Sequence, residues 1–188
     1  MKTFPALALL CLVSVLSTAC KPESEPAAGP QAQTSSATPA PGSTPSAAAS
    51  SFSAIQVPNP AAMVRVACAL DKINSQRAAQ QTVNLESGAD ARFVGWVSDP
   101  SRRVPATFKI VLKGPADSYG ADAKADRPRP DVARSLKSEA LANSGYNSVV
   151  SLAGVVPGEY EVGLMMDAGG KQAYCRTPAK VLVVGAPG

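Results

Sequence analysis

The chain has 188 residues and a formal net charge of +4, with 17 prolines, 14 glycines, four cysteines and no histidine. A length of this order suits one domain with a tail. The absence of histidine excludes every mechanism that needs an imidazole, among them the Ser-His-Asp triad and the HExxH zinc site. We therefore expect a protein that is not an enzyme and that holds no metal and no cofactor.

Residues 1–19 are predicted to be an export signal. Lys2 precedes an uncharged apolar run from Phe4 to about Leu16, and small residues follow up to Ala19. That run is shorter than the roughly 20 residues that a membrane-spanning helix needs. A cleaved signal is therefore expected and not a permanent transmembrane anchor.

Cys20 follows this signal directly. The stretch Leu16-Ser17-Thr18-Ala19-Cys20 resembles the lipobox of bacterial lipoproteins, although Ser17 stands where leucine is commonest. The resemblance implies that Cys20 is the site of lipid attachment. It also implies that the membrane is a partner, which the protein contacts through its N-terminal lipid. Lys21, in place of the aspartate that retains such proteins at the inner membrane, implies the outer membrane of the cell envelope. Ordinary cleavage after Ala19, which would give a soluble secreted protein, is the alternative.

Residues 20–60 are predicted to form the lipidated N-terminus and a disordered tether. The segment consists mainly of Ala, Ser, Thr, Pro and Gly. Such a composition buries too little apolar surface to offset the entropy of ordering the chain. We expect a spacer between the membrane and a folded domain, with a proline-rich peptide ligand as the alternative.

Residues 61–188 are predicted to form one mainly β domain. Apolar side chains alternate with other residues at a period of two, as in the run Val64, Val66, Cys68 and Leu70. Gly, Pro, Asp and Asn clusters separate seven such runs, which cover residues 64–70, 91–97, 108–113, 148–152, 159–166, 172–176 and 180–184. About seven short strands at this spacing predict a single antiparallel β-sandwich.

One long segment from Tyr119 to Asn147 interrupts the strand pattern. Within it, Asp131 as an N-cap predicts a short helix that ends near residues 143–145. Val132, Leu136 and Ala140 would share one face of this helix.

Two resemblances cover parts of the domain. The stretch Val156-Pro157-Gly158-Glu159-Tyr160-Glu161-Val162 resembles the penultimate strand of immunoglobulin-like and prealbumin-like bacterial sandwiches, which implies that Tyr160 fills the core. The order of Trp96, Tyr119, Arg129-Pro130-Asp131 and Tyr146 is similar to a small β-rich module of some bacterial envelope and membrane glycosyltransferase proteins. That resemblance implies no catalytic residue.

Cys68 and Cys175 are the two cysteines of the predicted domain. They lie on predicted strands of an exported chain and lack the Cys-x-x-Cys spacing of redox and zinc sites. We therefore expect a disulfide between them, with two buried thiols as the alternative.

The candidate ligand-binding residues are Trp96, Tyr119, Arg129, Asp131 and Tyr146. If the three aromatic side chains were exposed beside the charged segment around Arg129, they would favour glycan binding, whereas core packing of Trp96 is the simpler interpretation. Five basic residues between 124 and 137 are interleaved with four acidic ones between 122 and 139. This balance excludes nucleic acid as a partner, because neutralising phosphates needs an unbalanced basic face. A weak site for anionic glycans or lipid head groups is the alternative to an ion-paired loop.

The sequence thus predicts a membrane-anchored envelope lipoprotein whose sandwich has a noncatalytic structural or protein-binding role. The partner is an unknown envelope protein. A glycan- or polysaccharide-binding module of the envelope is the alternative. A histidine-free hydrolase is a third hypothesis, and it requires two carboxylates to converge in a pocket. Glu159 and Glu161, which share one strand face opposite basic neighbours, are better explained as solvated surface charge.

Overall fold

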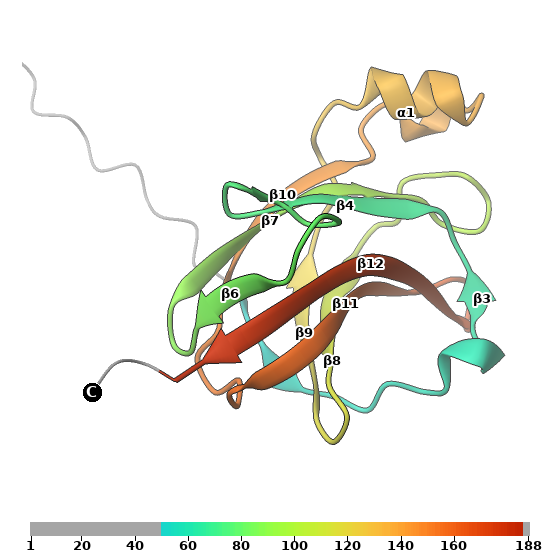
Figure 1. The fold of residues 1–188 in the computed structure, drawn as a ribbon. Coiled ribbons are helices and arrows are strands. Elements are labelled where there is room, and N and C mark those ends of the chain that lie inside the picture. The colour runs from blue at the N-terminus through green and yellow to red at the C-terminus, as the bar shows by residue number, and fades with distance from the viewer. Residues whose placement is uncertain (1–49, 186–188) are drawn as a thin grey trace, which may run out of the picture. The chain divides into compact units, whose positions relative to one another are not determined.

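The computed structural model describes residues 50–185, which form two β-sheets packed face to face around one core (Figure 1). A short helix stands above the sheet that contains β4, β7 and β10, on the side away from the second sheet. This arrangement confirms the predicted β-sandwich with one short helix in a long loop. The predictions for the export signal, for Cys20 and for residues 20–49 of the tether lie outside the described residues.

The first sheet has five strands in the order β1-β10-β7-β4-β5. Neighbouring strands are antiparallel, except that β1 runs parallel to β10. The strands are β1 (Ser50–Ser51), β4 (Cys68–Ile73), β5 (Gln76–Arg77), β7 (Asp90–Val97) and β10 (Gly145–Ser151).

The second sheet has seven strands in the order β2-β9-β8-β11-β12-β3, and β6 also pairs with β12. Its pairs are antiparallel, except that β3 and β6 run parallel to β12. The strands are β2 (Ser53–Ala54), β3 (Val64–Arg65), β6 (Val83–Glu86), β8 (Phe108–Lys113), β9 (Ser118–Ala123), β11 (Gly158–Asp167) and β12 (Gln172–Val184).

The strand boundaries differ from the predicted runs in three ways. The run 64–70 divides into β3 and β4, because the chain passes from one sheet to the other between them. The runs 172–176 and 180–184 join into the single strand β12, in which the Thr177 hydroxyl donates to the Val162 carbonyl (2.7 Å) and accepts from the Ala179 amide (3.2 Å). The strands β6 and β9 lie outside all predicted runs.

The core fills the space between the two sheets with alternate side chains of the long strands. Phe93 of β7 and Leu164 of β11 are completely buried, and Tyr160 is 4% exposed. The Tyr160 hydroxyl donates to the Val156 carbonyl (2.7 Å), so its one polar atom is satisfied at the edge of the core.

A disulfide joins the two sheets. Cys68 lies on β4 and Cys175 on β12, and their sulfur atoms are 2.06 Å apart. The predicted pairing is therefore confirmed.

Residues 50–60 belong to the sandwich and not to the tether, so the predicted domain boundary at residue 61 is wrong. Phe52 is 4% exposed and packs edge-on against Phe93, with their ring centres 6.0 Å apart. Further along, Ile55, Val57 and Met63 pack on the outer face of the seven-stranded sheet.

The helical segment is shorter than predicted. α1 spans Pro130–Ser135, and a 3-10 turn, η2, spans Glu139–Leu141; another such turn, η1, spans Pro60–Ala62. The N-cap of α1 is Arg129 and not Asp131, because Pro130 already occupies the first helical turn. Lys137 has φ of 51°, which ends the α-helical geometry before Ala140. Within residues 50–185, no helix is long and apolar enough to cross a bilayer.

Candidate functional site

Tyr119 and Tyr146, two of the five predicted ligand-binding residues, lie in the core, which corrects their assignment. Tyr119 is 6% exposed and Tyr146 is 1% exposed. The Tyr146 ring lies across Gly95 on the neighbouring strand, and its hydroxyl donates to the Ala69 carbonyl (3.4 Å). Burial raises the pKa of this hydroxyl far above its ordinary value. Neither tyrosine offers a surface to a ligand.

Trp96 lies on the outer face of the five-stranded sheet, which is the face turned away from the core. On β7, Ala91, Phe93 and Val97 are buried in the core, so Trp96 points the opposite way and is only partly buried. Its neighbours across the two adjacent strands are Ala69 and Gly145. The simpler interpretation of the sequence, which placed Trp96 in the core, is therefore wrong.

Arg129 forms a clamp over the same face. Its Nε and Nη2 atoms donate to both carboxylate oxygens of Asp131, and its Nη1 atom donates to Asp71 Oδ2 of β4 (2.8 Å). Its Cγ atom lies 2.8 Å from the place where a Cβ of Gly145 would be. Because Gly145 is on β10 and Asp71 on β4, the Arg129 side chain spans the intervening strand β7 beside Trp96.

The clamp has a clear electrostatic consequence. Hydrogen bonds from the Arg129 guanidinium are the main reason that the pKa of Asp131 falls to about 2, and the same contacts raise the pKa of Arg129. Of the five predicted ligand-binding residues, the structure brings Trp96, Arg129 and Asp131 together on this outer face, whereas Tyr119 and Tyr146 lie in the core. Asp71 completes the cluster, and no sequence pattern points to it, because it becomes a neighbour of Arg129 only through the strand order.

The loop 98–107 docks onto the segment that contains α1. The Ser138 hydroxyl donates to the Arg102 carbonyl (2.8 Å), and the Arg102 guanidinium donates to the Leu136 carbonyl (3.4 Å). The two docked segments carry four exposed cations, which we name the basic loop cluster: Arg102, Arg103, Arg134 and Lys137.

The sandwich has two ends of different character. The loop end carries the loops 98–107, 124–144 and 168–171, because β7, β9 and β11 finish there. The tether end carries Ser50, Gly185 and the shorter connections 87–89, 114–117 and 152–157. Both ends of the described chain therefore lie at the tether end, away from α1 (Figure 1).

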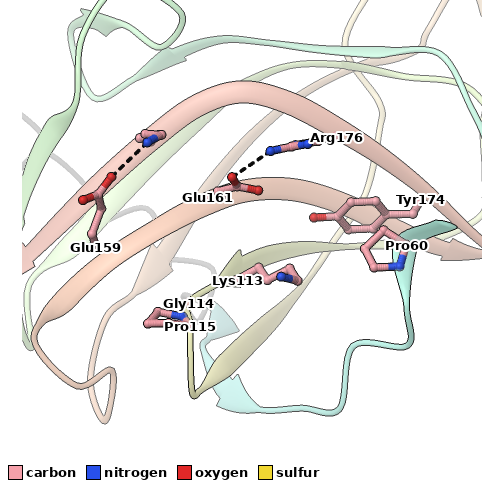
Figure 2. A pocket seen from close by; sticks show the side chains of 9 residues that line it. Pro60, Lys113, Gly114, Pro115, Glu159, Glu161, Tyr174 and Arg176 are labelled. Carbon is pink, nitrogen blue, oxygen red and sulfur yellow. Dashed lines mark hydrogen bonds and ion pairs between the residues drawn. The ribbon is translucent and has the colours of Figure 1, made fainter.

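A charged depression of about 540 Å³ lies on the outer face of the seven-stranded sheet (Figure 2). Glu161 contacts Arg176 (2.8 Å) and Glu159 contacts Lys180 (3.1 Å), while Tyr174 and Pro60 line the depression side by side. Burial, and next the charge of Glu161, raise the pKa of the Tyr174 hydroxyl. Glu159 and Glu161 share this depression, and each forms an ion pair with a cation of β12.

Within the part of the chain that the structure describes, no three acidic, cysteine or histidine side chains lie close enough to hold a metal ion. Comparisons of the chain with protein-family models, with curated proteins and with solved structures find no match.

Proposed function

We propose that this chain is an exported lipoprotein of the cell envelope, attached through an acylated Cys20 and located at the outer membrane. Its sandwich is a noncatalytic domain that binds a protein partner through the loop end. The lipobox resemblance of residues 16–20 supports the anchor. The disulfide supports export, because such bonds persist in oxidising compartments.

The division of the sandwich into two ends carries the binding proposal. The described chain begins at Ser50, at the tether end, so the loop end is the end farther from the point where the preceding residues join the domain. Loops held on a rigid sandwich are the usual place of binding residues in such folds. Here the loop end holds the partly exposed Trp96, and the Arg129 clamp fixes the adjoining segment to the sheet.

Tryptophan and arginine are also the residue types that contribute most to protein interfaces. The glycan alternative has less support, because it depends on an aromatic platform. Tyr119 and Tyr146 are buried, which leaves Trp96 as the single candidate for stacking on a sugar.

Photo-crosslinking in isolated envelope membranes tests the proposal. The full-length chain carries a photoreactive amino acid at Ser101 in the loop end, or at Ala116 in the tether end as a matched exposed control. We expect a protein adduct from position 101 and none from position 116. The absence of any protein adduct from position 101, in membranes that contain the folded protein, would contradict the proposal.

A further inference from the structure

The two ends of the sandwich carry opposite unpaired charge. The four residues of the basic loop cluster are exposed, and none forms an ion pair within residues 50–185. At the tether end the exposed residues without an ion pair in the same range include Glu86, Asp90 and Asp117. Asp99, Glu139 and Asp167 at the loop end and Lys113 at the tether end also lack an ion pair among the described residues, so each end carries an excess of one sign and not a single sign. We call the loop end the basic pole and the tether end the acidic pole.

The backbone of the basic loop cluster is unusual. Arg102 has φ of 57° and Lys137 has φ of 51°, and only one other non-glycine residue among 50–185, Asn74, has a positive φ. Glycine or asparagine suits this left-handed conformation better than a long side chain does. At Lys137 the left-handed residue ends α1, as is common at helix C-termini, and the Ser138 amide donates to the Ala133 carbonyl there (2.9 Å). The two positive φ values therefore fix the direction in which these basic side chains leave the backbone.

The cluster is also held in place. The Arg102 carbonyl accepts from Ser138, and the Asp99 carboxylate accepts from the Arg103 amide (2.8 Å). A loop whose backbone is already fixed loses less entropy on binding than a flexible one, and the planar donors of its arginines match carboxylate geometry.

We infer that the loop end binds an acidic surface of the protein partner, with the basic loop cluster facing that surface. This inference rests on the proposed function. Asp99, Asp126 and Glu139 lie among the cations, which suits a protein surface of mixed charge better than a uniform polyanion.

A membrane surface is the wrong occupant for the same pole. Ser50, where the residues after the proposed anchor join the domain, lies at the opposite end, and anionic head groups repel the unpaired carboxylates there. The distribution of charge therefore favours a protein, and not the membrane of the proposed anchor, as the occupant of the basic pole.

The test combines the position-101 photoprobe with charge reversal. The variant Arg134→Glu/Lys137→Glu alters two exposed side chains of the cluster, and Lys72→Glu/Arg77→Glu makes the same change of charge on the β4–β5 edge. We expect the adduct yield to fall at least tenfold in the first variant and less than twofold in the second. The yield of the wild-type protein should also fall in 0.5 M NaCl, because salt screens exposed charges.

The remaining outcomes separate the two proposals. A wild-type adduct that survives Arg134→Glu/Lys137→Glu would overturn the inference and leave the proposed function standing. An equal loss in both variants would mean a general charge effect and would also overturn it. If no protein adduct forms and the purified full-length chain instead binds polygalacturonate, the partner is an anionic glycan and both proposals fail. Near-ultraviolet circular dichroism and the intact disulfide serve as checks that each variant is folded.

Discussion

Arg129 shows how a single side chain can fix a loop to a sheet. It contacts Asp131 beside it in the chain and Asp71 on β4, which is 58 residues away. The guanidinium fork makes this possible, because its donors point in several fixed directions at once. Arg129 therefore anchors the 124–144 segment to the five-stranded sheet, next to Trp96.

The clamp predicts a specific pH dependence. Because the folded pKa of Asp131 is lowered from 3.8 to about 2, the contribution of this contact is present above about pH 4 and is lost as the pH falls toward 2. Arg129→Gln should return the pKa of Asp131 toward its ordinary value, as measured by carbon NMR titration of the carboxyl group. Lys109→Gln, which removes a cation that contacts Asp122, is the control. An unchanged Asp131 titration in Arg129→Gln would show that the clamp does not form in solution.

Gly95 allows the Tyr146 ring to cross β7. A methyl group at this position would overlap the Ala69 carbonyl oxygen and lie 2.6 Å from the Tyr146 hydroxyl. We expect Gly95→Ala to lower the free energy of unfolding by about 1–3 kcal/mol, as overpacking does in other cores. Urea denaturation measures this change. Gly158→Ala is the control with an expected change within about 0.5 kcal/mol, because its nearest neighbour would be 3.6 Å away. Equal stability of the two variants would contradict the described packing.

At the scale of elements, the long strands were predictable because their alternation is strong. β7, β8 and β11 coincide closely with predicted runs. β9 was not predictable, because its sequence SYGADA offers mainly small side chains and Gly120 is covered by Ile55 from a distant segment. The two-residue strands β1, β2 and β3 depend in the same way on partners that only the folded chain supplies.

The candidate site was predictable only in part for the same reason. Alternation alone places Trp96 and Val97 on opposite faces of β7, but it does not show which of the two faces packs against the core. The burial of Tyr119 and Tyr146 depends on their ring partners Tyr160 and Phe108 on other strands. The contact between Arg129 and Asp71 depends on strand order, which no local pattern contains.

The disulfide links elements that hydrogen bonds do not join, since β4 and β12 belong to different sheets. It closes a loop with a sequence separation of 107 residues. By the chain-entropy model, replacing both cysteines with alanine should therefore lower the free energy of unfolding by about 4–5 kcal/mol. Denaturant unfolding of the oxidised protein and of Cys68→Ala/Cys175→Ala measures the difference. A loss below about 1 kcal/mol would mean that the bridge contributes little to holding the two sheets together.

At the scale of the whole molecule, the proposed anchor and the proposed binding surface belong to opposite ends of the sandwich. The chain joins the sandwich at the tether end, whereas Trp96, the Arg129 clamp and the basic loop cluster lie toward the other end. The proposal that the loop end binds a partner away from the anchor depends on this placement of Ser50. This account of the two ends requires that Cys20 carries lipid.

The mass of the N-terminal peptide of the protein extracted from the envelope is therefore the most direct measurement. The account predicts a mature chain that begins at an acylated Cys20, and it predicts that Cys20→Ala moves the protein out of the membrane fraction. An unmodified Cys20, or a Cys20→Ala protein that stays with the membrane, would contradict the account.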